Sequence, residues 1–456
     1  MNNVDRTPKQ KTHSKQLETR LMLNRTLYAM ICLFACTICS AQVAAPPPPQ
    51  SKTIVIHGAT LHTVSGETIS EGTLVFADGK FVAVGDDTDT PADAVSIDLG
   101  GKHIYPGLFE AHSQIGLTEI SSVSATIDHS ETGNMNPNVK AIVAVNPESD
   151  IIGVTRAGGV LIAVTAPGSG VVSGQAAVIQ LDGWTYEDMT VSAEAAMVVN
   201  WPSFGRRRRF GPPQDDEPST SSRVDELKKL FEDARRYQEL RKDADANQAF
   251  DLRLESLDNT LSGKTPLYVR ADALADIEAA VAFAVEQNVR IIILGGYDAP
   301  LCAELLKKHD VPVVVSAVYR MPRRQSDPDD HAYTLPRRLD EAGIRFCISS
   351  TDRSETWNTR NLPFHAGTAI AHGLDADSAL KSVTLYPAQI FDVDDRLGSL
   401  EVGKDATFIV TDGDPLDTRT NIEKAFVQGR EIDLSSRHTR LYEKYKLKYD
   451  QLKSND

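Results

Sequence analysis

Two side chains that can take part in acid–base or metal chemistry follow segments of small and apolar residues. His112 follows residues 106–111, and Asp352 comes shortly after the apolar segment 345–349. Imidazole and carboxylate groups are common ligands of catalytic zinc and common carriers of protons in hydrolysis. The chain has eleven histidines and five cysteines. The composition therefore supplies enough donors for a metal site, and their positions decide whether one forms.

Two further histidines are candidates for a site near these residues. His365 lies after the segment that carries Asp352 and could face a pocket, but a place in the first turn of a helix is the favoured interpretation. His129 has Asp128 and Glu131 as neighbours, and we expect a polar surface loop there. The other histidines show no convincing ligand spacing.

The elements that must position these residues alternate between apolar strands and helices. Such alternation predicts βα units with parallel strands, and the number of segments suits an α/β fold of the (β/α)8 TIM-like barrel type. In that fold the catalytic side chains lie at the carboxyl ends of the strands. After residue 104 the expected strands are 159–165, 176–181, 266–269, 290–294, 312–317 and 345–349, and the expected helices are 277–285, 300–307 and 378–390.

Both ends of the chain beyond residue 50 have a different pattern, of short strands joined by tight turns. Asp78-Gly79 is a hairpin signal between two of these strands. Because strand character returns near the end of the chain, we predict that the two ends complete one small composite β-sandwich. The expected strands are 53–62, 73–77, 80–84, 95–99, 405–411 and 425–427.

These patterns divide the chain into consecutive parts. We assign 42–105 and 393–434 to the sandwich and 106–392 to the barrel. The polar tail 435–456 is expected to form a surface helix or to be disordered.

A strongly charged insertion, 201–264, interrupts the barrel pattern. Leu227, Phe231 and Ala234 recur at helical spacing, so we predict a helix over 223–253. The four arginines 206–209 could attract anions to the mouth of a pocket, but a solvated loop is the favoured interpretation.

The first 41 residues are typical of a secretory signal peptide. A basic segment precedes the apolar run 27–39, and cleavage after Ala41 is plausible. The run is shorter than the roughly 20 residues that span a bilayer, so a membrane anchor is the less favoured alternative. A lipoprotein signal at Cys36 is a minor alternative because bulky Phe34 fits it poorly, and Met22 is an alternative start. We expect an exported, periplasmic protein whose only membrane contact is the signal segment.

Charge and cysteine content limit the partners of the mature chain. The formal net charge is −15, and removal of residues 1–41 leaves 42 basic against 61 acidic residues. A nucleic acid partner is not expected, because gripping phosphates requires a basic face. Cys302 and Cys347 are the cysteines that remain, and we interpret them as buried small hydrophobic residues rather than a disulfide.

Several motifs, in order along the chain, resemble those of the amidohydrolase superfamily. They are Pro106-Gly107-Leu108-Phe109-Glu110-Ala111-His112-Ser113-Gln114, Ser350-Thr351-Asp352, Asn361-Leu362-Pro363, Thr384 to Ala388 and Arg396 to Ala406. The resemblance covers roughly 53–432 and is strongest to the imidazolonepropionase-like branch. It implies a zinc-dependent barrel hydrolase that acts on C–N bonds other than peptide bonds, with a composite sandwich.

The resemblance also implies a metal ligand at each of five positions, and only two are filled by ligand types. His112 matches the first histidine and Asp352 the final aspartate, whereas Gln114, Arg270 and Gly295 stand where histidines belong. No lysine occurs between residues 141 and 222, so the bridging lysine of binuclear members is not available. We therefore expect either no metal or one weakly bound divalent ion on His112 and Asp352.

Two hypotheses for function follow. In the first, the protein hydrolyses a small C–N substrate with Asp352 as base beside His112, Arg270 stabilises the oxyanion, and Gln114, Gly295 and His365 line the pocket. In the second, it is a catalytically inactive pseudoenzyme that serves as a binding or scaffolding subunit. Either protein could form a homo-oligomer, or a hetero-oligomer with a related amidohydrolase.

Overall fold

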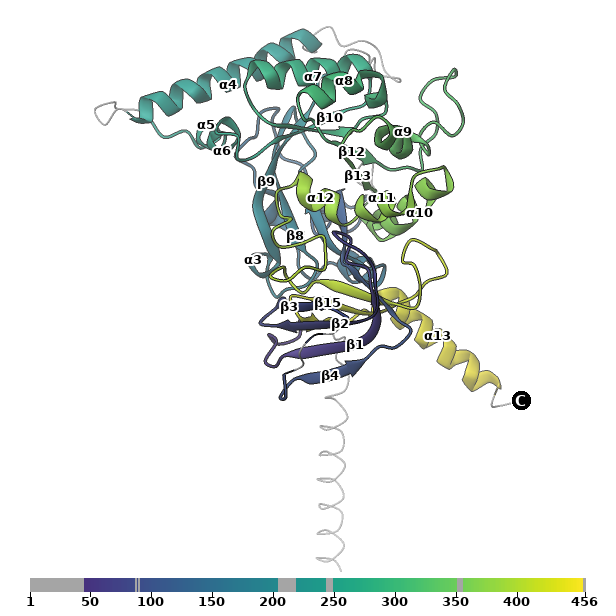
Figure 1. The fold of residues 1–456 in the computed structure, drawn as a ribbon. Coiled ribbons are helices and arrows are strands. Elements are labelled where there is room, and N and C mark those ends of the chain that lie inside the picture. The colour runs from purple at the N-terminus through teal and green to yellow at the C-terminus, as the bar shows by residue number, and fades with distance from the viewer. Residues whose placement is uncertain are drawn as a thin grey trace, which may run out of the picture. The chain divides into compact units, whose positions relative to one another are not determined.

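The computed structural model describes residues 45–86, 88, 91–203, 219–242, 249–350 and 356–453. Residues 46–456 form one compact unit that contains two eight-stranded sheets (Figure 1). The predicted signal peptide and the arginines 206–209 lie outside the described residues. Within the described part of the chain, no helix is long and apolar enough to cross a membrane.

One of the two sheets, which we call the barrel sheet, forms a nearly closed barrel. Its strands lie in chain order, and Ser349 on the last strand donates a hydrogen bond to the carbonyl of His112 on the first, at 3.1 Å. The predicted TIM-like barrel is therefore confirmed. The strands are β6 (Leu108–Ser113), β7 (Val160–Thr165), β8 (Val172–Gln180), β9 (Thr190–Asn200), β10 (Leu267–Ala271), β11 (Ile291–Gly295), β12 (Val313–Ser316) and β13 (Phe346–Ser349).

One part of this sheet differs from a regular (β/α)8 barrel. Strand β8 runs antiparallel to both β7 and β9, while the other neighbouring pairs are parallel. The connections 166–171 and 181–189 are too short for the crossover of about a dozen residues that parallel strands require. The sequence pattern did not predict β9, and it did not indicate the change of direction.

Helices cover the outside of the barrel (Figure 1). The predicted helix 378–390 is two helices, because Thr384 between them has non-helical dihedral angles (φ −138°, ψ −83°). The α-helices of this region are α2 (Asp150–Ala157), α3 (Tyr186–Met189), α7 (Leu274–Glu286), α8 (Ala303–Lys308), α9 (Leu335–Glu341), α10 (Leu362–Ala371), α11 (Ala376–Lys381) and α12 (Leu385–Ile390). Short 3₁₀ turns are η2 (Ser124–Thr126), η3 (Ala141–Ala144), η4 (Ala299–Cys302) and η5 (Thr356–Asn361).

The charged insertion contains the predicted helix, but with different bounds. Helix α4 (Thr220–Lys242) buries Leu227, Phe231 and Ala234, as the spacing predicted, and packs Phe231 edge-on against Phe283 of α7. The prediction of helix as far as residue 253 was wrong. Asp251 instead accepts the amide N–H of Arg253 at 2.9 Å and starts the new helix α5 (Leu252–Glu255), which α6 (Asp258–Leu261) follows.

The other sheet, which we call the composite sheet, is built from both ends of the described chain, as predicted. Its order is β16-β15-β14-β5-β1-β2-β3, with β4 paired to β1. It is one sheet that curls over its own core, since the Ala406 amide reaches the Gly79 carbonyl at 2.7 Å. Phe76, Phe408 and Phe426 pack together inside it. The strands are β1 (Ile54–Leu61), β2 (Ile69–Ala77), β3 (Lys80–Gly85), β4 (Val95–Asp98), β5 (His103–Pro106), β14 (Phe408–Thr411), β15 (Ile422–Val427) and β16 (Arg430–Glu431).

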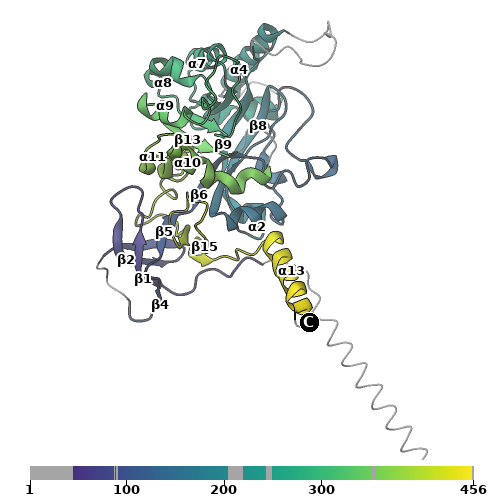
Figure 2. The ribbon, with the colours of Figure 1, turned by 90° about the vertical axis from the view of Figure 1, so that its right-hand side faces the viewer.

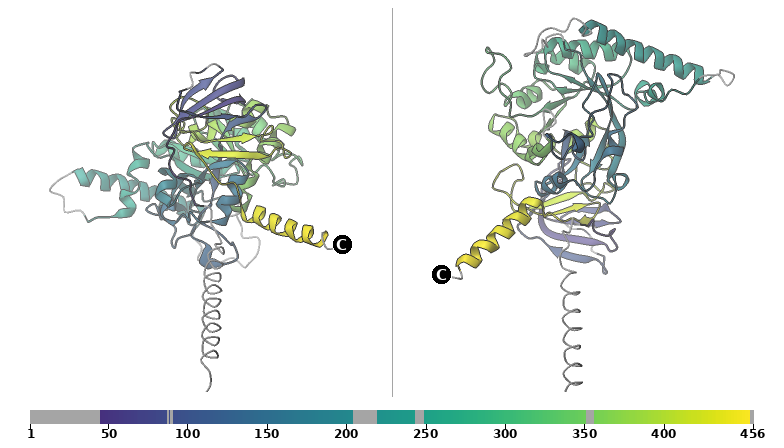
Figure 3. Two further views of the ribbon diagram at one scale, coloured as in Figure 1. Left: turned by 90° about the horizontal axis from the view of Figure 1, so that it is seen from below. Right: turned by 180° about the vertical axis from the view of Figure 1, so that it is seen from behind.

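The tail forms a surface helix, α13 (Arg437–Lys453), which is one of the two expected outcomes. Arg437 and Arg440 at its start lie 3.7 and 3.8 Å from the carboxylate of Asp150 in α2. Figure 2 shows the helix extending beyond α2, and Figure 3 shows it leading to the C-terminus.

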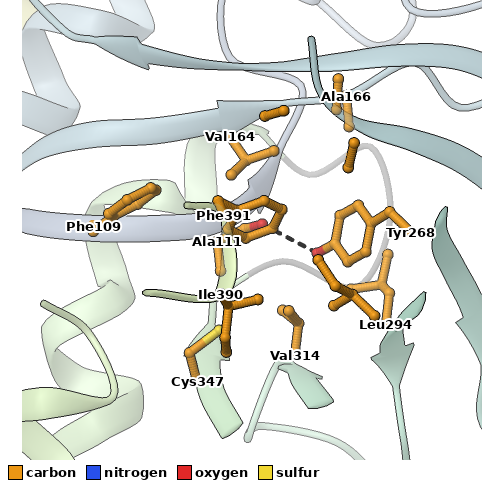
Figure 4. Close-up of a cluster of buried hydrophobic side chains, with 14 of the residues drawn as sticks. Phe109, Ala111, Val164, Ala166, Tyr268, Leu294, Val314, Cys347, Ile390 and Phe391 are labelled. Atoms are coloured by element: carbon orange, nitrogen blue, oxygen red, sulfur yellow. Dashed lines mark hydrogen bonds between the residues drawn. The ribbon is translucent and has the colours of Figure 1, made fainter. Parts of the chain in front are cut away.

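Apolar side chains fill the interior of the barrel below its carboxyl end (Figure 4). Tyr268 is fully buried there, and its hydroxyl donates to the Ala111 carbonyl at 3.1 Å. Cys347 lies in the same cluster, and both it and Cys302 are buried, free cysteines, as predicted. Because buried apolar side chains fill the interior, we expect the chemistry at the mouth above it.

Two helical glycines test this packing. In α10, a Cβ at Gly367 would overlap the backbone carbonyl of Leu416, whereas in α2 a Cβ at Gly153 would meet its nearest atom at 3.6 Å. We expect Gly367→Ala to lower the free energy of unfolding by about 1–3 kcal/mol. The matched variant Gly153→Ala should raise it by roughly 0.5–1 kcal/mol. Denaturant unfolding measures both, and equal effects would contradict the described packing of α10.

Candidate active site

A cavity of about 670 Å³ opens at the carboxyl ends of the barrel strands. His112 on β6 and Arg270 on β10 contribute to its wall, together with residues from the loops that follow the strands. This is the place where barrels of this type carry their chemistry. The described residues that line it are His112, Gln114, His129, Pro167, Gly168, Val198, Asn200, Trp201, Ser203, Arg270, Ala271, Asp272, Asp276, Arg320 and Arg323.

The central contact of the cavity joins His112 to Arg270. The Nη2 atom of Arg270 lies 3.0 Å from Nε2 of His112, whose side chain is only 3% exposed. A guanidinium group is a donor and never an acceptor, so Nε2 accepts and the ring proton sits on Nδ1. Burial, reinforced by the charge of Arg270, holds the pKa of His112 well below its usual value. The ring is therefore neutral at neutral pH, and the lone pair of Nε2 is directed at Arg270.

A buried carboxylic acid, Glu110, supports His112 from below. It accepts the amide N–H of His112 at 3.1 Å and that of Ser350 at 3.0 Å, and it also bonds the Ser350 hydroxyl. Complete burial raises the pKa of Glu110, while these hydrogen bonds oppose the shift. Glu110 thereby links the ends of β6 and β13, the first and last strands of the barrel.

Gln114 and Gly295 have different places in the structure. Gln114 lines the cavity, as expected. Gly295 is buried and is absent from the described lining of the cavities, so the structure does not place it in the pocket. Its backbone has φ +107°, and a Cβ there would lie 2.6 Å from the carboxylate of Asp272. A histidine at this position would therefore collide with the side chain of Asp272 unless that side chain moved.

Asp272, which the sequence analysis did not single out, is the anchor of an arginine cluster. Arg320 binds it through both terminal nitrogens at 3.2–3.3 Å, and Arg323 approaches it at 2.9 Å. Burial by itself would raise the pKa of Asp272, but the two arginines outweigh it and the pKa is lowered. The signal available in the sequence was position, because residue 272 follows one strand segment and 320–323 follow another.

His365 borders a second cavity and holds a neighbouring loop. It lies in the first turns of α10, as the favoured interpretation held, and borders a smaller cavity of about 410 Å³ that also touches Arg320 and Arg323. Its Nδ1 accepts the amide N–H of Val318 at 3.0 Å and so holds the loop after β12. Burial lowers the pKa of His365 to about 4.

His129 and Asp352 are the remaining candidate site residues. His129 lies on a loop after β6 whose neighbouring residues Asp128 and Ser130 are exposed, as expected. Its half-buried side chain also lines the main cavity, where its Nδ1 is 2.9 Å from the Thr118 hydroxyl. Burial lowers its pKa although Asp128 acts in the opposite sense. Asp352, the expected base, lies outside the described residues.

The described residues do not fit a divalent metal ion. They contain no group of three or more His, Cys, Asp or Glu side chains placed to hold one. The one matching histidine, His112, directs its Nε2 lone pair at a permanently charged guanidinium 3.0 Å away, which would repel a cation. The cavity lining is instead cationic, because its described residues include three arginines and two aspartates.

Comparison with known proteins places this fold and site in a family. The pattern described as "Amidohydrolase family" matches residues 210–432. The solved structure of an amidohydrolase from Thermotoga maritima is 27% identical, with a TM-score of 0.75, over 83% of this chain and 99% of that one.

Among curated proteins, the relatives align over part of their length. Amidohydrolase tasK of Hapsidospora irregularis is 22% identical over 76% of this chain, which spans 38% of that protein. The imidazolonepropionase of Syntrophobacter fumaroxidans is 37% identical over 82 residues, or 18% of this chain and 19% of that protein. The chain thus covers well under two thirds of either relative.

The barrel, the composite sheet and these matches define a protein of the amidohydrolase superfamily, a family of hydrolases. Within it, the chain is similar to two imidazolonepropionases, each across 18% of its length.

The pKa of His365 gives a prediction for stability. A histidine with a pKa of about 4 when folded and about 6.5 when unfolded binds its proton first in the unfolded state. Its contribution is therefore complete above about pH 6.5 and is lost as the pH falls to about 4, by up to roughly 3 kcal/mol. We expect His365→Gln, which keeps an acceptor for Val318, to flatten the pH dependence of the free energy of unfolding over this range.

The comparison carries its own control. At pH 8 the histidine is neutral in both states, so the variant and the parent should differ little there. A variant that loses as much stability between pH 6.5 and 4 as the parent does would contradict the assignment.

Proposed function

We propose that this protein hydrolyses a C–N bond, other than a peptide bond, in a small anionic molecule, and that Arg270 replaces a metal ion as the positive charge of the site. The observation that carries the proposal is the hydrogen bond from Arg270 to His112 at the wall of the 670 Å³ cavity. Family membership supports the reaction type, and the chemistry of the donor set supports the absence of a required metal.

Arg270 is suited to stabilise an oxyanion. Its guanidinium group stays charged at any physiological pH and has five N–H donors, of which His112 orients one. A fixed positive charge beside a carbonyl oxygen lowers the energy of the tetrahedral intermediate, as oxyanion donors do in other hydrolases. In this proposal His112 is a positioning residue, because its neutral ring holds the guanidinium in place.

The proposed reaction needs one base, and the sequence motif assigns that role to Asp352. A water molecule attacks the carbonyl carbon and gives its proton to the Asp352 carboxylate, while Arg270 stabilises the oxyanion. When the C–N bond breaks, the proton passes from Asp352 to the departing nitrogen. The products are a carboxylic acid and an amine, so atoms and charge balance.

The proposed substrate class follows from Arg320 and Arg323, the two arginines that contact Asp272. Arg323 lines the same cavity, is about two-fifths exposed, and shares Asp272 with Arg320. Two guanidinium groups against one carboxylate leave an excess positive charge for an anionic substituent. We infer a substrate with a carboxylate or similar group on the far side of the scissile bond.

On the pattern of residues 1–41 we also propose that the protein is exported. The pseudoenzyme hypothesis gains no support from the reported relatives, which are named as enzymes.

Turnover of acylated amino acids and cyclic amides tests the activity. We expect Arg270→Met to lower kcat/KM by about 10²–10³-fold, the usual loss when one oxyanion donor is removed, and Asp352→Asn to abolish turnover. The matched variant Arg323→Gln should mainly raise KM, since it removes binding that is equal in the ground and transition states. Ligand binding by calorimetry without any turnover would refute the enzyme proposal and leave a binding protein.

Elemental analysis tests the metal-independent part of the proposal. The purified protein should contain well under one equivalent of zinc, iron or manganese, and a chelator should leave its turnover unchanged. A stoichiometric metal that survives dialysis, together with loss of turnover in chelator, would show that Arg270 does not replace the ion.

A further inference from the structure

Helix α13 (Arg437–Lys453) exposes every one of its residues. Its first turn is tied to α2 through Asp150, and His438 lies 3.2 Å from Arg360. Beyond this start the helix carries large apolar and aromatic side chains that are 41% to 64% exposed. A helix held in place by packing would bury such residues, so these side chains are available to a partner.

The exposed apolar residues lie on one face. At 3.6 residues per turn, five of them fall within an arc of about 100° along the helix. This apolar stripe consists of Leu441, Tyr442, Tyr445, Tyr449 and Leu452. Leu447 is on the opposite side, and it provides an internal reference for the stripe.

Lysines border the apolar stripe on both sides. By the same geometry Lys444 and Lys448 lie along one edge and Lys446 and Lys453 along the other, whereas Glu443 and Asp450 lie opposite the stripe. The ammonium groups of Lys446 and Lys448 are 5.8 and 5.7 Å from the rings of Tyr442 and Tyr449. The lysine stems therefore extend the apolar surface while their charges stay at its rim.

The charge of the helix is opposite to that of the chain. Six lysines and arginines and two acids give α13 a net charge of +4, in a chain with a net charge of −15. Basic residues that flank an apolar stripe of leucine and tyrosine are the composition of helices that lie in the interface of an anionic membrane. Tyrosine in particular favours the level of the lipid headgroups.

We propose that α13 docks on the surface of an anionic phospholipid membrane, with the apolar stripe at the headgroup boundary and the lysines on phosphate groups. A second copy of the helix fits less well, because the lysine rims would face each other while the acids point away from the contact. The proposal is independent of the proposed function, since none of these residues lines the cavity.

Vesicle co-sedimentation of the full chain tests the docking. We expect at least about tenfold more protein on vesicles of phosphatidylcholine and phosphatidylglycerol than on phosphatidylcholine alone, and a loss of this excess as salt rises from about 0.1 to 0.5 M. The variant K444E/K448E should lose the excess and retain its helical circular dichroism. The parent and this variant share the N-terminal segment, so the difference between them excludes binding through that segment.

A tryptophan placed in the helix gives a second measurement, which reports the face that makes contact. Tyr445→Trp lies in the apolar stripe, and Leu447→Trp is the matched variant on the opposite side. With the parent spectrum subtracted, only Tyr445→Trp should shift its emission to shorter wavelength on anionic vesicles.

Three outcomes would overturn the proposal: equal binding to both kinds of vesicle, equal shifts at positions 445 and 447, or a shift at 445 without vesicles that grows with protein concentration. The last would identify a second copy as the partner. Turnover of the K444E/K448E variant should match that of the parent, so a failure of this proposal is distinguishable from a failure of the proposed function.

Discussion

A single charged hydrogen bond, from Arg270 to His112, sets the character of the barrel mouth. It links strands β6 and β10 at 3.0 Å, and burial together with the charge of Arg270 lowers the pKa of the imidazole and keeps it neutral. Because a guanidinium group does not release its proton at physiological pH, the barrel mouth contains a permanent cation beside His112. The other features of the mouth are consistent with this charge, including the paired arginines around Asp272.

The scaffold holds this contact in place through the closure of the barrel. Glu110 joins the ends of β6 and β13, and Tyr268 reaches from β10 to the carbonyl of Ala111. Both groups are buried, so each would cost free energy if its partner moved away. The neutral His112 and the charged Arg270 are thus positioned by interactions that also close the sheet, and site and fold are stabilised together.

Much of the fold could be predicted from residue patterns, because hydrophobic periodicity and turn residues act locally. The strands from β10 to β13, the hairpin at Asp78-Gly79 and the buried face of α4 all follow such patterns. Strand β9 and the reversed direction of β8 did not, since direction depends on the length of the connections and on neighbours distant in sequence. The helix expected over 378–390 is also divided, because Thr384 has a non-helical backbone conformation.

The sequence by itself determined the superfamily and the barrel with its composite sheet, and it singled out Gln114, Arg270 and Gly295 as positions where the resemblance implies histidines. Only the tertiary structure decided what these residues contact, because it joins positions that are separate in the sequence, by 158 positions for His112 and Arg270. Arg270 meets His112, Gly295 makes room for Asp272, and His129 turns toward the cavity although its neighbours in the sequence suggest a surface loop. The eleven histidines suggested a metal site by their number. In the structure, the guanidinium group of Arg270 lies 3.0 Å from His112 and disfavours a metal cation there.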